Sequence, residues 1–171
     1  DLLVDGYTFA YDKDGTNLLD VYSTAHTDEG RTVYVVPHTH SNFNSDNKCA
    51  CGYTCPHAEI NDDGTCKLCG KEMVASVTVG ANVTYYDTLG NALNYAKQNN
   101  GYMLKLLADV TGTTVQINDP FIFDLNGHSV DALSVNAKAT IKDSGTKKGK
   151  IGTLNIYKKD ADPEANAPTI V

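Results

Sequence analysis

The sequence predicts a mainly β chain, in which a short β-solenoid with one N-terminal capping helix is joined to a small zinc-ribbon-like module. Short β-branched segments separated by Gly, Asn and Asp turns fill most of the chain, and this pattern is typical of strands. Only one stretch has the apolar spacing of an amphipathic helix. All five cysteines lie within residues 49–69, where apolar residues are scarce. Metal ligands are therefore expected to replace a hydrophobic core in that segment.

Charge and hydropathy argue against two classes of function. The 171-residue chain has a net charge of −7 and a pI near 5.0, whereas nucleic-acid binding requires a basic face. No run of about 18 apolar residues is present, so we expect no membrane insertion. The first residues lack a signal peptide and an initiating Met. We interpret the chain as a piece of a longer protein with adjacent modules.

Residues 1–37 are predicted as short strands that end a preceding β module. Asp-Gly and Glu-Gly turn signals separate the segments, and residues 32–36 are rich in β-branched and aromatic side chains. Pro37 ends this last strand. Residues 38–74 then lose nearly all apolar content and gain the cysteines and most histidines, which indicates a separate zinc-binding module.

Residues 75–160 are predicted to form the β-solenoid, with its capping helix at 88–98. The helix has Asp87 or Thr88 as N-cap, and its apolar stripe consists of Leu89, Ala92, Leu93 and Ala96. From residue 102 onward, apolar strands recur about every 15–20 residues, which favours stacked coils over a sandwich or barrel. About three coils leave an open end whose strand edges can pair with another chain. Residues 161–171 are rich in Pro, Ala and charge and are predicted as a linker or tail.

The Cys and His residues are spaced like metal ligands. The segments CACG and CKLCG both end in glycine, which permits the tight turn of a zinc knuckle. Eight side chains divide into two sets of four, so we expect two zinc ions. We assign one ion to His38, His40, Cys49 and Cys51, and the other to Cys55, His57, Cys66 and Cys69. Four protein ligands leave no position for water, so both ions are predicted to be structural.

Other uses of the cysteines stay open at this point. A single zinc ion held by Cys51, Cys55, Cys66 and Cys69 would leave the histidines as bystanders. A disulfide-stapled loop would leave one free thiol, because the number of cysteines is odd. A thioredoxin-like redox pair is disfavoured because Cys66 and Cys69 precede no apolar βα unit.

Acidic and aromatic residues outside this module suggest two different functions. A polysaccharide-active β-helix enzyme would use paired carboxylates, with Asp109, Asp124, Asp131 and Asp143 as candidates. Asp124 and Asp143 stand in DLNG and DSG, which are ordinary turn contexts, and His128 follows Asn-Gly. Binding to another protein would instead use tyrosines, which are common in recognition surfaces. The candidates for contact are Tyr85, Tyr86, Tyr95 and Tyr102 around the predicted helix.

Several segments in this order resemble a repeat module of large surface proteins of Gram-positive gut bacteria. They are PHTHSNFNSDNKCACGYTCPHAEINDDGTCKLCGKEM, YYDTLGNALNYAKQNNGYMLKLLADVTG and FDLNGHSVDALSVNAKATIKDSG. In that family a Cys/His zinc-binding linker precedes the start of a right-handed β-helix. The resemblance covers roughly residues 37–156, although KQNNGYMLKLL replaces the Gly-Asp turn usual in the family.

The resemblance implies a right-handed β-solenoid and an extracellular place, on the bacterial cell surface or secreted. It implies an adhesin or host-protein-binding module whose partner is a host protein or glycoprotein, with immunoglobulin a candidate. We therefore expect a non-catalytic binding module with structural zinc. The alternatives are a spacer in a surface stalk and, less favoured, a fragment of a polysaccharide-active enzyme.

Overall fold

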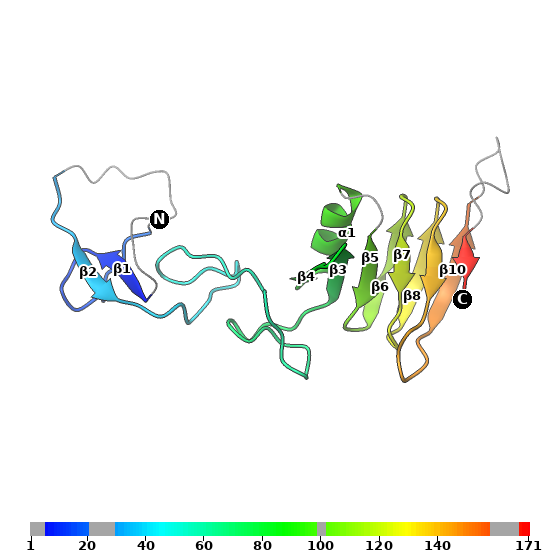
Figure 1. Cartoon of the computed structure of the whole chain (residues 1–171), viewed down its shortest axis with the longest axis horizontal. Helices are drawn as coiled ribbons and strands as arrows, with labels where there is room; N and C mark the ends of the chain where they lie inside the picture. Colours follow the sequence, from blue (N-terminus) through cyan, green and yellow to red (C-terminus); the bar gives the residue numbers. More distant parts are fainter. Residues whose placement is uncertain (1–5, 21–29, 99–101, 158–167) are drawn as a thin grey trace. The chain divides into compact units, whose positions relative to one another are not determined.

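The computed structural model describes residues 6–20, 30–98, 102–157 and 168–171 (Figure 1). The chain divides into two compact units. The first comprises Asp1–His57 and Lys67–Gly70, and the second comprises Ala58–Cys66 and Lys71–Val171. The described part is mainly β with one helix, as the sequence predicts. None of its helices is long and apolar enough to cross a membrane.

A two-stranded antiparallel sheet forms the regular part of the first unit. It pairs β1 (Tyr7–Ala10) with β2 (Tyr34–Pro37), and Ala10 and Val36 are buried. The turn after β1 is held by Asp12, whose carboxylate accepts hydrogen bonds from the backbone amides of Thr16 and Asn17 at 2.9 and 2.7 Å. Because this sheet pairs only four residues of each strand, we expect other interactions to stabilise the rest of the unit.

Two sheets form the second unit. The three-stranded sheet has the order β10-β8-β6, and the six-stranded sheet has the order β11-β9-β7-β5-β3-β4. The strands of the three-stranded sheet are β6 (Val110–Ile117), β8 (Val130–Val135) and β10 (Ile151–Ile156). Those of the six-stranded sheet are β3 (Ala75–Val79), β4 (Asn82–Tyr86), β5 (Met103–Leu106), β7 (Ile122–Asp124), β9 (Thr140–Lys142) and β11 (Thr169–Ile170).

Successive strands alternate between the two sheets from β5 onward. All neighbours within the set β5, β7, β9 and β11 pair in parallel, and so do β6, β8 and β10. The register places apolar residues above one another, for example Leu104, Phe123 and Ile141, which are all buried. The core of this unit therefore consists of columns of apolar side chains that run across the strands.

The helix α1 (Leu89–Lys97) packs on β3, β4 and β5 and lies at one end of the strand stack (Figure 1). Thr88 is its N-cap, because the Thr88 hydroxyl accepts a hydrogen bond from the backbone amide of Asn91 at 3.3 Å. Ala92 and Ala96 are fully buried in the common core. The predicted helix and its apolar stripe are thus found within one residue of the expected bounds.

Some elements differ from the expectations. The antiparallel pair β3–β4 opens the range predicted as solenoid, because the positive φ of Gly80 allows a tight hairpin between the two strands. Strand β11 lies in the predicted tail 161–171, where it pairs with β9; residues 161–167 lie outside the described part. The division into units falls inside the predicted module 38–74, because residues 58–66 and 71–74 pair and pack with the second unit.

Candidate metal centre

The first group of metal-ligating side chains follows β2 and comprises His38, His40, Cys49 and Cys51, here called the first cluster. Both cysteines are buried and both histidines are half-buried. A knuckle-like turn carries the thiols: the Gly52 amide donates to the Cys49 carbonyl at 2.9 Å, and the Cys49 amide donates to the Tyr53 carbonyl at 3.0 Å. These four residues are the first set that the sequence predicts.

The ligand atoms of the first cluster all lie within 4.8 Å of one another. His40 Nδ1 is 3.5 Å from each of the sulfurs of Cys49 and Cys51, and His38 Nε2 is 3.7 Å from Cys49 Sγ. A tetrahedral ion with ordinary bond lengths to sulfur and nitrogen requires about 3.6 Å between such atoms. The two sulfurs, at 2.7 Å, would have to separate by about 1 Å to reach tetrahedral spacing. The donor set therefore fits one tetrahedral ion after this small adjustment.

Neighbouring groups hold the first cluster in place. The ring of Tyr53 stacks on the imidazole of His40, with 3.8 Å between centroids and 13° between planes. Gly52 has φ of +84°, and a Cβ at this position would overlap the carboxylate of Asp20. The Asp20 side chain could move away from such a Cβ, but the positive φ would strain any other residue at position 52 in the turn that carries both thiols.

The protonation state of Cys51 bears on metal binding. Burial, and next the adjacent Cys49 thiol, raise the pKa of the Cys51 thiol to about 11. The metal-free thiol is therefore protonated at neutral pH, and a metal ion must displace this proton to bind the thiolate. The site favours a cation strong enough to compete with a proton for sulfur.

A second group comprises Cys55, His57 and Cys69, here called the second cluster. Cys55 and His57 are buried and Cys69 is half-buried. All three belong to the first unit, whereas Cys66 belongs to the second unit, where its amide donates to the Lys71 carbonyl at 2.8 Å. The structure thus brings together three of the four predicted ligands, and the role of Cys66 as the fourth stays a prediction.

The alternative of one zinc ion held by four cysteines does not match these groups. Cys51 is grouped with Cys49 and two histidines, and Cys55 is grouped with His57 and Cys69. None of the five cysteines is in a disulfide in the structure. Two groups among the described residues could therefore hold metal ions, in agreement with the predicted number of sites.

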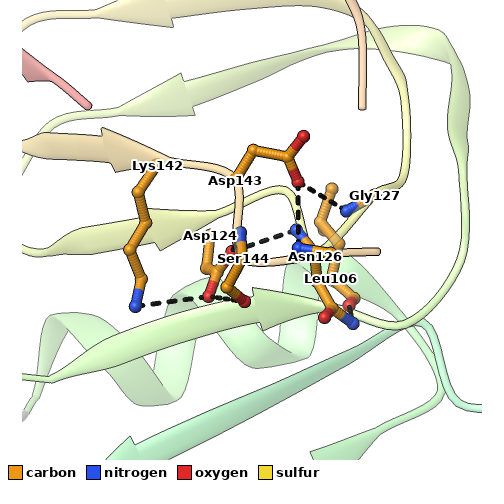
Figure 2. Close-up of polar contacts among 8 residues, drawn as sticks. Leu106, Asp124, Asn126, Gly127, Lys142, Asp143 and Ser144 are labelled. Carbon is orange, nitrogen blue, oxygen red and sulfur yellow. Dashed lines mark hydrogen bonds and ion pairs between the residues drawn. The ribbon is translucent and has the colours of Figure 1, made fainter. Parts of the chain in front are cut away.

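Two of the four candidate catalytic aspartates, Asp124 and Asp143, act as acceptors in the turns of the second unit (Figure 2). Asp124 is fully buried, and its carboxylate accepts from the Asn126 amide at 3.0 Å, the Ser144 amide at 2.9 Å and the Ser144 hydroxyl at 2.7 Å. Lys142 Nζ lies 3.4 Å from the same carboxylate. Asp143 accepts from the amides of Gly127 and Gly149 at 2.6 and 2.7 Å. These carboxylates therefore join one turn to the next.

The other two aspartates have similar contacts. Asp109 accepts from the Ser129 amide at 2.8 Å, and Asp131 accepts from the Gly112 amide at 2.7 Å. Each bond links residues about one strand repeat apart, with separations of 20 and 19 residues. The carboxylates of Asp109 and Asp131 thus also accept hydrogen bonds that link neighbouring turns.

The pKa values of two of these carboxyl groups are lowered below 3.8. For Asp124, burial raises the pKa, but the hydrogen bonds from Ser144 and Asn126 and the charge of Lys142 outweigh it. For Asp143, the amides of Gly149 and Gly127 lower the pKa. A general acid for glycoside hydrolysis requires a raised pKa instead. Both groups are ionised at neutral pH.

A cavity of about 330 Å³ in the second unit was missed by sequence reasoning. Its lining includes Asp63, Glu72, Met73, Leu107, Asp109 and His128. His128 Nδ1 lies 3.4 Å from an Asp109 carboxylate oxygen, but the residues described as lining the cavity include no Ser, Thr or Cys. The contact could not be predicted locally, because the two residues are 19 positions apart.

The tyrosines predicted for contact have different surroundings. Tyr85, Tyr86 and Tyr95 are half-buried, and the rings of Tyr86 and Tyr95 are 5.7 Å apart. Tyr102 is buried and stacks on Phe121 at 4.7 Å, and burial raises its pKa to about 12. The prediction that Tyr102 offers contact surface is therefore wrong, because its ring belongs to the core.

Comparisons with protein-family models, curated proteins and solved structures find no match for this chain.

Proposed function

We propose that this chain is a non-catalytic binding module whose Cys/His segments are held by two structural zinc ions. The observation that carries the proposal is the first cluster, in which four side chains supply four ligand atoms within 4.8 Å. Two thiolates and two imidazoles are a donor set that suits tetrahedral zinc. With all four positions filled by protein, no position is left for a reacting water.

In this proposal the zinc ions supply folding free energy to a segment that has little core. In the described residues of the first unit the only sheet is two-stranded, and few apolar residues besides cysteines are buried. Structural zinc contributes on the order of 10 kcal/mol in such small modules. His38, His40, Cys49 and Cys51 would hold one ion, and Cys55, His57 and Cys69, with Cys66 as the predicted fourth ligand, would hold the other.

The second unit is proposed to be a short β-solenoid. From β5 onward, strands that alternate between two sheets and pair in parallel within each sheet, with apolar columns in register, support this assignment. The hydrogen bonds that Asp109, Asp124, Asp131 and Asp143 accept support a structural use of the carboxylates, which disfavours a polysaccharide-active enzyme. Right-handed coiling rests on the resemblance alone.

Recognition of a host protein or glycoprotein, with immunoglobulin as a candidate, is proposed from the resemblance. A location on the bacterial cell surface or in secretions is likewise proposed from the resemblance. Tyr85, Tyr86 and Tyr95 gather around β4 and α1 and keep part of their surface in solvent. Such side chains supply contact area at low cost in conformational entropy.

Binding of the zinc-loaded chain to purified immunoglobulin and purified mucin tests this proposal. We expect saturable binding that is lost when Tyr85 and Tyr86 are both changed to Ala, at unchanged zinc content. Tyr7→Ala, at an exposed position of the first unit, is the matched control and should bind normally. Absence of binding to either protein would favour the spacer, and cleavage of a glycan that Asp124→Ala abolishes would favour the enzyme.

A further inference from the structure

The cavity of about 330 Å³ in the second unit has both apolar and ionisable lining residues. Its apolar lining comes from Met73, Leu107 and Ala108. Its ionisable lining consists of the side chains of Asp63, Glu72, Asp109 and His128. The residues that the structure describes as lining the cavity include no lysine or arginine. The cavity therefore combines an apolar wall with an excess of acidic groups.

Backbone hydrogen bonds join the segments that form the cavity. In three of them the first-named amide donates to the second-named carbonyl: Met73 to Gly64 at 3.0 Å, Leu107 to Val74 at 2.9 Å, and Val110 to Ser129 at 2.8 Å. These bonds connect the turn that carries Asp63 to the segment that carries Asp109, and that segment to the turn that carries His128. The fold therefore sets the shape of the cavity before a ligand binds, and such preorganisation lowers the cost of binding.

Two of the carboxylates are held in place through one oxygen each. Asp63 Oδ1 accepts hydrogen bonds from the Thr65 amide at 3.0 Å and from the Thr65 hydroxyl at 2.6 Å. Asp109 Oδ1 accepts from the Ser129 amide at 2.8 Å and lies 3.4 Å from His128 Nδ1. The hydroxyl and the amide of Thr65 lower the pKa of Asp63, so this carboxylate is ionised at neutral pH. Within the described part of the chain, these contacts leave Oδ2 of both carboxylates as an acceptor for a ligand.

The acidic groups of the cavity are not arranged like the ligands of a metal ion. Among the described residues, the groups of at least three ligand atoms within 4.8 Å of one another are the first and second clusters. The carboxylates of the cavity form no such group. An ammonium group does not require this close convergence, because each of its three N–H donors can reach a separate acceptor. Charge and spacing together favour an organic cation over a metal ion.

We propose that the cavity binds a primary ammonium group on an aliphatic stem. The ammonium would donate hydrogen bonds to Asp63, Glu72 and Asp109, and the stem would lie against Met73 and Leu107. A guanidinium fork is best matched by both oxygens of one carboxylate, whereas Asp63 and Asp109 each offer one oxygen.

The size of the cavity limits the ligand. A volume of about 330 Å³ is at the lower end of the range for small-molecule sites, so it suits a small amine or one lysine side chain of a partner protein. The site uses none of the tyrosines or metal ligands of the proposed function. The two proposals can therefore fail independently of each other.

NMR titration of the isotope-labelled, zinc-loaded chain tests the proposal. The probes are cadaverine, which is a free diamine, Nα-acetyl-lysine amide, which imitates a lysine side chain in a protein, and the uncharged diol with the same stem as cadaverine. We expect at least one of the two amines to cause saturable shifts of backbone amides that include those of Gly64 and Ala108, and the diol to cause none. The amine that binds more tightly indicates whether the ligand is a free amine or a protein side chain.

One pair of variants separates a specific site from general attraction to an acidic chain. Glu72→Gln should raise the dissociation constant of the amine at least about tenfold, since it removes one charge-assisted hydrogen bond. Asp62→Asn is the matched control and should leave the constant unchanged, because Asp62 does not line the cavity and the substitution changes the net charge equally. Both positions are exposed, and far-UV circular dichroism verifies that each variant is folded.

Three results would overturn the proposal. The first is the absence of saturable shifts with both amines, and the second is equal binding of the diol, which would mean that the charge is not recognised. The third is an equal effect of Glu72→Gln and Asp62→Asn on the dissociation constant. The wild-type comparison of diamine and diol keeps the test valid even if a variant fails to fold.

Discussion

Replacing the buried carboxylate of Asp124 tests whether this residue holds the fold or performs catalysis. The Asp124→Ala change removes the acceptor of three hydrogen bonds, two of them from Ser144 and one from Asn126. Hydrogen bonds to charged groups contribute about 1.5–3 kcal/mol each. Two effects make the loss smaller than the sum of the three hydrogen bonds. Water can replace part of the two hydrogen bonds from Ser144, which is exposed, and the change also removes a buried charge. We therefore expect a loss of about 3 kcal/mol in the free energy of unfolding.

Thermal unfolding followed by circular dichroism measures this loss. For a unit of about 100 residues, 3 kcal/mol corresponds to a fall of about 12 °C or more in melting temperature. Asp124→Asn retains one acceptor oxygen and should cost less. Asp62→Ala, at an exposed position of the same unit, should stay within about 0.5 kcal/mol of the wild type. An Asp124→Ala variant as stable as Asp62→Ala would refute the reasoning.

Three further predictions follow from the turns and the metal clusters. The lowered pKa values of Asp124 and Asp143 favour the folded state above pH 4, so their contribution is lost as the pH falls through the folded-state values below 3.8. The stability difference between wild type and Asp124→Asn should accordingly shrink below pH 4, and a difference unchanged down to pH 2 would contradict this. Gly127→Ala should destabilise the second unit more than Gly80→Ala, because both glycines have positive φ but only Gly127 places a Cβ 2.8 Å from the Lys147 carbonyl; equal losses in urea unfolding would exclude the steric effect. Removal of metal by a chelator should unfold residues 38–57 and leave most of the far-UV β signal of residues 75–157, whereas loss of the whole signal would mean that the two regions unfold together.

Local sequence signals predict some of these features and miss others for physical reasons. The helix α1 has its own N-cap and apolar stripe, so short-range spacing is sufficient to predict it. Strand β11 contains two residues and depends on pairing with β9, 29 positions earlier in the sequence, so no local pattern predicts it. The burial of Tyr102 likewise depends on stacking with Phe121, a contact across 19 positions.

The two candidate metal clusters also contain contacts that the sequence predicts and contacts that it does not. The sets His38-x-His40 and Cys49-x-Cys51 are close in sequence, and the structure brings all four residues together. Cys66 precedes Cys69 by three positions, but the described second cluster does not include it. Ligand spacing predicts which residues can meet, whereas the pairing of Cys66 with Ile60 and its bond to Lys71 depend on the fold of the second unit.

Zinc content by elemental analysis of protein purified without chelator tests the central claim most directly. Two zinc ions per chain are expected, with one lost in Cys49→Ser and the other lost in Cys55→Ser. Cys66→Ser should also lose one ion if Cys66 is the fourth ligand of the second site. Two results would contradict two structural zinc sites. One is a single zinc ion per chain that is lost in Cys49→Ser and equally in Cys55→Ser, and the other is free reaction of all five thiols in the native, metal-loaded chain.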